Sequence, residues 1–245
     1  MYKGRFFVRE QVWICGGYMD ADIFPVYQKA GKRRGRCKPT SEVQKSLNQR
    51  NSSKKATRLA HLNFGPADIA LHLTYREPPE SPERAQRDLQ NFLRRVKRQR
   101  AKEGLPPLKY MTVTEVGGNG RAHHHAIMSG GMSRDALEGL WGKGYANSKR
   151  LQFGPDGIAG LTKYVTKGRQ FYKRWNQSRN LAKPEPVESV LTAREAKEIA
   201  ADLEGKKRRG CLDARYPGWE LTDATCERNA VNGGVYIRLE MRRQE

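Results

Sequence analysis

A glutamate and three consecutive histidines, joined by a glycine-rich turn, are the residues whose spacing most clearly suggests chemistry. Glu115 ends the segment LKYMTVTEV, the turn GGNG follows, and His123, His124 and His125 lie in RAHHHAIM. On a strand, His123 and His125 project from one face and His124 from the other. If the hairpin is centred on Asn119, Glu115 lies opposite His123 and shares its face. One carboxylate and two imidazoles then converge, which predicts a divalent-metal site.

This mixed ligand set suits Mn²⁺ or Mg²⁺ acting as a Lewis acid, and imidazole would also accept Zn²⁺. Two other interpretations stay open at this point. The histidines could form an exposed cluster without a catalytic metal. A bulge in the hairpin would turn Glu115 away from the histidines.

A second candidate group lies in PDGIAGLTKYVTKG, where we expect a helix capped by Asp156 and ended by Gly168. Tyr164 and Lys167 are three residues apart and therefore share a helical face. A phenol with a pKa of about 10 is a poor nucleophile at neutral pH. A cation on a phosphate and a nearby ammonium would favour its attack, which would form a phosphotyrosine. Taken alone, such a tyrosine is more often a packing residue.

The elements around these residues alternate in a regular order. IALHLTY has the two-residue period of a strand, and the segment after REPPESPE has the apolar stripe of a helix. The two strands of the hairpin follow, then a helix from Ser133 to about Trp141 and a short strand near Tyr145–Leu151. The pattern predicts an α+β fold in which helices flank a central antiparallel sheet.

The flanking segments are less regular. We expect strands around Arg5–Cys15 and Met19–Tyr27, a basic loop, and a polar helix that begins near Glu42. LTAREAKEIAADLEG predicts a surface helix and GGVYIRLEMRR a final strand, whose pairing with the N-terminal strands is one hypothesis. We therefore divide the chain into a basic N-terminal region (1–66), a catalytic core (67–175) and a C-terminal extension (176–245).

The charge of the chain predicts a polyanionic partner. Among 245 residues, 47 are Lys or Arg and 26 are Asp or Glu, which gives a formal net charge of +21. Such an excess favours salt-dependent binding to nucleic acid. No apolar run approaches the length of a membrane helix and no signal peptide is evident, so we expect a cytoplasmic protein without a membrane partner. The candidate DNA contacts, each of which could instead be solvated or packed, are Lys32, Arg33, Arg34, Arg94, Arg95, Arg98, Lys163 and Trp141.

Four motifs resemble those of one enzyme superfamily. HHH is similar to the histidine-hydrophobic-histidine motif of HUH endonucleases, and KYVTKG to their Tyr-x-x-Lys motif. IALHLTYREP resembles the first motif of rolling-circle replication initiators of small single-stranded DNA phages and mobile elements. LEGLWGKGYANSKRL resembles the linking segment of that group. The resemblance covers roughly residues 69–168.

The resemblance implies a ferredoxin-like or RNA-recognition-like sheet. His123, His125 and, as the third ligand, Glu115 would hold the metal, Tyr164 would be the nucleophile, and Lys167 its helper. Such an enzyme nicks single-stranded origin DNA and keeps a 5′-phosphotyrosine and a free 3′-hydroxyl. No P-loop motif is present, so strand separation would need a host helicase, and synthesis a host polymerase, in a bacterial cell.

Two departures from the family pattern are visible. The hydrophobic position between the ligands is His124, and Gly160 stands where related phage initiators often have a second tyrosine. The sequence thus predicts a single-tyrosine enzyme. The alternatives are an HUH transposase or relaxase, a non-catalytic nucleic-acid-binding protein, and a metal-independent RNA nuclease.

Overall fold

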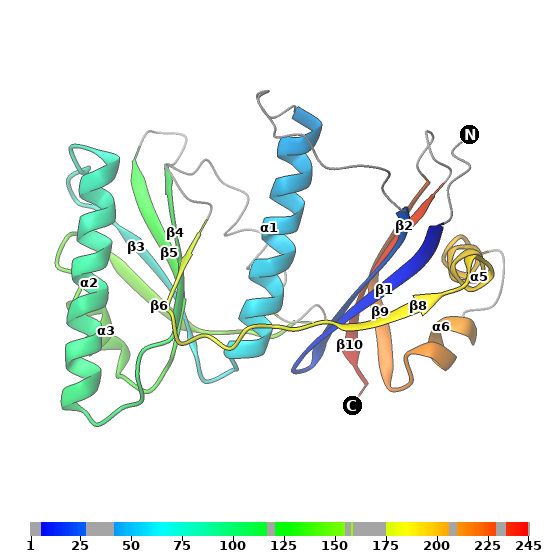
Figure 1. The fold of residues 1–245 in the computed structure, drawn as a ribbon. Helices are drawn as coiled ribbons and strands as arrows, with labels where there is room; N and C mark the ends of the chain where they lie inside the picture. Colours follow the sequence, from blue (N-terminus) through cyan, green and yellow to red (C-terminus); the bar gives the residue numbers. More distant parts are fainter. Residues whose placement is uncertain are drawn as a thin grey trace. The chain divides into compact units, whose positions relative to one another are not determined.

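The chain folds into two compact units, which we describe separately (Figure 1). The computed structural model describes residues 6–27, 42–116, 121–154, 158, 175–205, 210–228 and 234–244. The central unit comprises residues 48–154 and 158–183, and the terminal unit comprises residues 1–47, 155–157 and 184–245. Each unit contains one antiparallel five-stranded sheet, which confirms the predicted α+β class.

The central unit has the β-α-β-β-α-β order of ferredoxin-like folds. Its sheet has the strand order β6-β3-β5-β4-β7, and helices follow the first and third strands of the repeat. Strands that are distant in sequence, β3 and β5, are therefore neighbours. The elements are β3 (Ile69–Thr74), α2 (Pro82–Lys102), β4 (Tyr110–Val116), β5 (Ala122–Met128), α3 (Arg134–Gly139), β6 (Ala146–Arg150) and β7 (Asn176–Gln177).

Alternation along β3 separates the two faces of this sheet. Ile69, Leu71 and Leu73 are buried in one core cluster with the apolar stripe of α2, whereas Ala70 and His72 project from the opposite face. The α2 helix begins as the sequence predicts, because the Ser81 side chain accepts a hydrogen bond from the backbone N–H group of the first turn and Pro82 follows it. One face of the sheet is thus the packed side.

The opposite face is partly covered by α1 (Glu42–Asn63), whose residues from Asn48 onward belong to this unit. Ala56, Leu59 and Ala60 of the helix form a second cluster with Met111 of β4 and Ile127 of β5. Those strand residues lie at the end of the hairpin away from its turn. The histidines lie toward the turn, beyond this apolar cluster.

The terminal unit joins the two ends of the chain. Its sheet has the order β8-β1-β2-β10-β9, and β10 pairs with β2 in the register Ile237↔Ile23. The hypothesis that the final strand joins the N-terminal strands is confirmed. The elements are β1 (Phe6–Cys15), β2 (Tyr18–Tyr27), β8 (Val187–Leu191), α5 (Ala193–Leu203), α6 (Gly210–Arg215), β9 (Trp219–Arg228) and β10 (Val235–Arg243).

A buried carboxylate organises the core of the terminal unit. Glu10 on β1 accepts hydrogen bonds from Arg215 at 2.7 and 2.5 Å, from Tyr216 at 2.6 Å and from Ser189 at 2.6 Å. Burial by itself would raise the pKa of Glu10, but these hydrogen bonds and the Arg215 charge lower it overall. None of the helices in the described ranges is long and apolar enough to cross a membrane.

Candidate metal centre

The hairpin of β4 and β5 has the register that the spacing predicts. Glu115 pairs directly with His123, and the pairing continues without a shift from Tyr110↔Met128 to Val116↔Ala122. Along these pairs there is therefore no bulge to turn Glu115 away. Glu115 is 7% exposed and lies on the same face as the side chains of His123 and His125.

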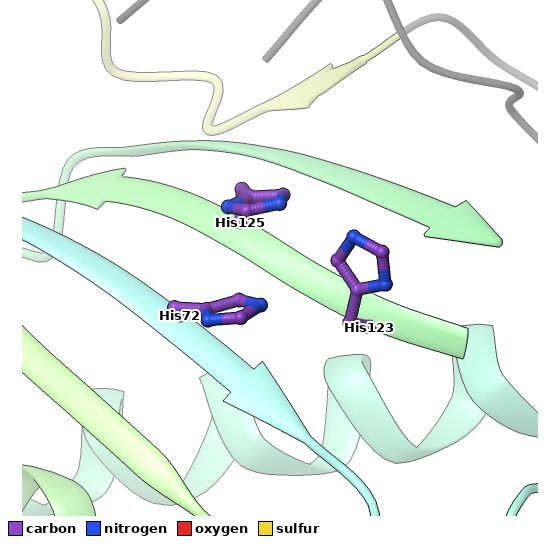
Figure 2. Close-up of side chains that lie close together, drawn as sticks. All are labelled: His72, His123 and His125. Carbon is purple, nitrogen blue, oxygen red and sulfur yellow. The ribbon is translucent and has the colours of Figure 1, made fainter. Parts of the chain in front are cut away.

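A third imidazole, which the sequence analysis did not assign to the site, comes from β3. His72 is paired with His125 across the β3–β5 ladder, so both rings project from the same face (Figure 2). The rings of His72 and His125 are stacked, with centroids 4.6 Å apart and planes 5° from parallel. The His123 ring lies edge-on to both, at 5.4 Å from His72 and 5.1 Å from His125. One nitrogen from each of the three rings lies within 4.8 Å of the others.

The Glu115 carboxylate lies against this histidine cluster. Its Oε2 atom is 3.4 Å from His123 Nε2 and 3.7 Å from His125 Nε2. These distances are longer than ordinary hydrogen bonds. They are close to the separation of roughly 3–3.5 Å expected between two ligand atoms that each lie about 2.1 Å from one ion. The spacing thus fits a shared cation better than direct pairing.

Burial leaves these polar groups in need of a partner. The buried His72 Nε2 and Glu115 Oε1 atoms have no hydrogen-bond partner among the described residues. An unsatisfied buried polar atom costs about 1–3 kcal/mol. A cation would satisfy both atoms, and this is the observation by which the residues fit a metal.

Electrostatics keep the imidazoles ready to bind a cation. Burial, followed by the nearby His72 and His123 rings, lowers the pKa of His125 to about 4. Burial and His123 also lower the pKa of His72. At neutral pH these rings are uncharged, and only a neutral imidazole offers a lone pair to a metal.

His124 belongs to the packed face and not to the metal centre. It is fully buried and bonded at both nitrogens, with Nε2 2.8 Å from Tyr75 Oη and Nδ1 2.8 Å from Thr114 Oγ1. Its ring lies edge-on to Trp141, with the centroids 5.6 Å apart. Burial lowers the pKa of His124 to about 3, so the ring is neutral and replaces the hydrophobic residue of the related motif.

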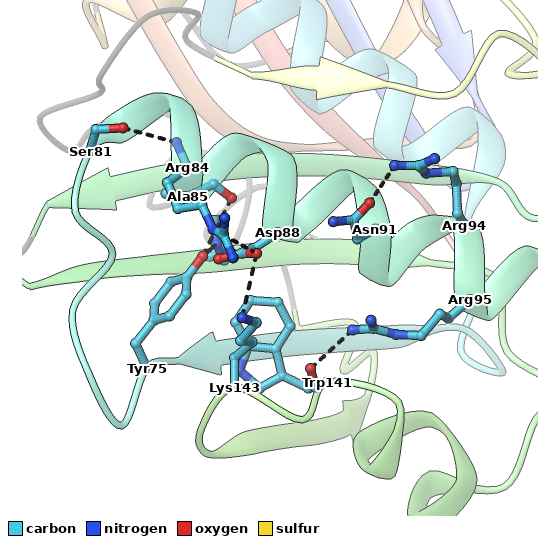
Figure 3. A network of polar contacts seen from close by, with 11 residues as sticks. Tyr75, Ser81, Arg84, Ala85, Asp88, Asn91, Arg94, Arg95, Trp141 and Lys143 are labelled. Atoms are coloured by element: carbon cyan, nitrogen blue, oxygen red, sulfur yellow. Dashed lines mark hydrogen bonds and ion pairs between the residues drawn. The ribbon is translucent and has the colours of Figure 1, made fainter.

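A polar network fixes the packed face beneath the histidines (Figure 3). Asp88 of α2 lies 3.5 Å from Arg84 and 3.8 Å from Lys143. Next to them, the Tyr75 hydroxyl lies within reach of the Ala85 carbonyl at 3.4 Å as well as His124. The network ties α2 to the end of β3 and to the segment before β6, and so supports the strand that carries the ligand candidates.

The Trp141 candidate is corrected by this packing. Trp141 is fully buried, and its indole donates a hydrogen bond to the Thr74 carbonyl at 2.7 Å. It is a core residue and has no face free for stacking on a base. Arg95 is likewise committed, because its guanidinium donates to the carbonyls of Leu140 and Trp141.

The other candidates for DNA contact stay predictions. Arg94 and Arg98 are exposed on α2, the layer on the side of the sheet opposite the histidines. The catalytic candidates Tyr164 and Lys167 lie outside the described residues, as do the remaining basic candidates Lys32, Arg33, Arg34 and Lys163. The structure therefore places the predicted ligands Glu115, His123 and His125 together and adds His72 to them.

Two signals in the sequence point to His72 in retrospect. It is a polar residue on the outward parity of a strand whose other face is apolar, and it lies in the segment IALHLTYREP that resembles a replication-initiator motif. Neither signal reveals that β3 is the neighbour of β5. Tyr145 is a second such residue: it is 63% exposed, and its carbonyl accepts a hydrogen bond from Thr74 N–H at the end of β3.

The fold and site together define a class: a ferredoxin-like sheet that carries a cluster of imidazoles and a carboxylate suited to a divalent cation. The family model for the replication-associated protein ORF2 matches residues 68–169. This segment begins just before β3 and contains the histidine cluster, and the similarity is consistent with a replication initiator. No curated protein and no solved structure matches the chain.

Proposed function

We propose that this protein is a metal-dependent endonuclease that nicks and rejoins single-stranded DNA at a replication origin, as the initiator of rolling-circle replication. The convergence of His72, His123, His125 and Glu115 on one face of the central sheet is the observation that carries the proposal. The match to replication-associated proteins supports the biological role. The net charge of +21 supports a polyanionic substrate.

In the proposed reaction, His123, His125 and Glu115 hold Mn²⁺ or Mg²⁺ next to the scissile phosphate. The bound cation would polarise the phosphate and neutralise the charge that develops on it. The partial exposure of His123, whose side chain is 21% accessible, gives the phosphate a route to this centre. The burial of Glu115 keeps its carboxylate directed at the histidines.

Tyr164 is proposed as the nucleophile. Its phenolic oxygen forms a bond to phosphorus as the bond from phosphorus to the 3′-oxygen breaks, and the phenolic proton is released while the leaving oxygen gains a proton. Lys167 would orient the phosphate and favour the phenolate. The products are a 5′-phosphotyrosine and a free 3′-hydroxyl that can prime synthesis by a host polymerase in the bacterial cytoplasm. Attack of a 3′-hydroxyl on the phosphotyrosine reverses the step and joins the strands.

A covalent-adduct assay tests the proposal. The full chain is incubated with Mn²⁺ and single-stranded fragments that tile the replicon carrying its gene, and adducts are resolved by denaturing electrophoresis. We expect an SDS-resistant adduct that EDTA abolishes and that the Tyr164→Phe variant does not form. His123→Ala should lose the adduct but keep salt-dependent DNA binding.

Two results would contradict the proposal. Binding of all fragments without any cleavage would indicate a non-catalytic nucleic-acid-binding protein. Cleavage of RNA alone, with no protein attached to the product and no metal requirement, would indicate an RNA nuclease.

A further inference from the structure

We infer that His72 is a fourth ligand of the metal centre, and that the resulting centre of three imidazoles and one carboxylate prefers a transition-metal cation to Mg²⁺. The inference rests on the metal centre of the proposed function and adds to it a ligand and a metal class.

The position of His72 is the first argument. Each of the three neighbouring strands β3, β5 and β4 presents a ligand candidate toward the same place: His72 pairs with His125, and Glu115 pairs with His123. Figure 2 shows the His72 ring in line with that of His125, with the His123 ring beside them. A nitrogen of His72 lies as close to the other two rings as they require to share one ion. The hairpin thus supplies three donors, and β3 supplies the fourth.

The lack of another role for His72 is the second argument. A structural histidine is normally hydrogen-bonded, as His124 is at both ring nitrogens. By contrast, the buried His72 Nε2 has no hydrogen-bond partner among the described residues. Its cross-strand neighbour on β6, Asn147, directs its amide to the Tyr145 hydroxyl at 3.0 Å. A metal ligand role accounts for a buried imidazole placed in this way.

The chemistry of the donors decides the class of metal. Mg²⁺ prefers oxygen ligands, keeps several water molecules and is bound through one or two carboxylates. Imidazole is a better ligand for Zn²⁺, Co²⁺ and related ions, and affinity for a given site rises from Mn²⁺ to Co²⁺. Three imidazoles with a single carboxylate form a nitrogen-rich set. The site should therefore bind Co²⁺ more tightly than Mn²⁺, and Mn²⁺ more tightly than Mg²⁺.

Metal titration of the full chain tests the inference without DNA. The protein is stripped with EDTA, dialysed and titrated with Co²⁺, Mn²⁺ and Mg²⁺ by calorimetry, and the visible spectrum of the Co²⁺ form is recorded. His72→Ala should weaken Mn²⁺ binding by roughly 100-fold or more, since even partners beyond the ligands contribute 10–100-fold. It should also change the Co²⁺ spectrum. Thr74→Ala, on the same face of the same strand, is the matched control and should leave both unchanged.

Wild-type affinity of His72→Ala for Mn²⁺ would overturn the ligand assignment. Equal affinity of the unaltered protein for Mg²⁺ and Mn²⁺ would overturn the metal preference, and this measurement needs no variant. Both readouts are separate from nicking. Tight, His72-dependent metal binding by a chain that forms no DNA adduct would support the inference while contradicting the proposed function.

Discussion

The burial of His124 predicts a specific dependence of stability on pH. Its pKa is lowered by burial from 6.5 to about 3, so the folded chain leaves His124 neutral where the unfolded chain protonates it. The unfolded state then binds more protons, and the free energy of unfolding must fall as pH falls through 6.5. For one histidine with an unfolded pKa near 6.5, the loss between pH 7 and pH 5 is about 2 kcal/mol.

Removing the imidazole should remove this dependence. His124→Leu has a similar side-chain volume and cannot be protonated, so its free energy of unfolding should fall by about 2 kcal/mol less than that of the wild type between pH 7 and pH 5. The absolute stability of the variant will be lower, because Tyr75 and Thr114 each lose a hydrogen-bond partner. That loss does not vary with pH in this range, so the difference in slope isolates His124.

Urea unfolding at several pH values, followed by circular dichroism with EDTA present, measures the effect. Tyr75→Phe is the matched control: it removes one hydrogen bond to His124 but leaves the imidazole, and it should keep the wild-type slope. Equal slopes for wild type and His124→Leu would refute the reasoning. They would mean that His124 is not buried on the packed face, and that the division of the three histidines between two faces is wrong.

Three further predictions concern other parts of the structure. Tyr145→Ala should weaken binding of single-stranded DNA in a fluorescence titration at least about 5-fold, since stacking on an exposed ring contributes roughly 1–3 kcal/mol per base; unchanged affinity would exclude this ring from the DNA path. Gly144→Ala should destabilise the chain by roughly 1–3 kcal/mol, because the new Cβ would lie 2.5 Å from the Thr74 carbonyl oxygen, whereas Gly139→Ala meets no atom within 4 Å and should be neutral; equal thermal midpoints for the two variants would contradict this. Glu10→Gln should lower the free energy of unfolding at pH 7 and weaken its decline in acid, because the carboxylate with its lowered pKa stabilises the fold only above that pKa; a variant that keeps the full acid decline would show that Glu10 is not its source.

Local patterns in the sequence are sufficient to predict the hairpin but not its neighbours. A short glycine-rich connection between two strands sets the register, so the pairing of Glu115 with His123 follows from spacing alone. His72 joins the site through a pairing of strands separated by a helix and a further strand, β3 with β5, which no local periodicity reports. Trp141 illustrates the same limit, because its burial depends on α2 and on a carbonyl at the end of β3.

The terminal unit shows where strand signals fail. The final strand and α5 have clear patterns, and both are present. Strands β8 and β9 have no continuous buried face, since β8 is mostly exposed at the sheet edge and β9 alternates between exposed and half-buried positions. Their membership in the sheet comes from pairing with β1 and β10, which the sequence alone does not specify.

Pulsed electron paramagnetic resonance of the Mn²⁺-loaded chain tests the metal centre most directly, because it detects nitrogen nuclei bound to the ion. The account predicts strong ¹⁴N modulation that weakens in His72→Ala, His123→Ala and His125→Ala and persists in His124→Leu. Bound Mn²⁺ without nitrogen modulation, or a signal lost only when His124 is replaced, would contradict the account.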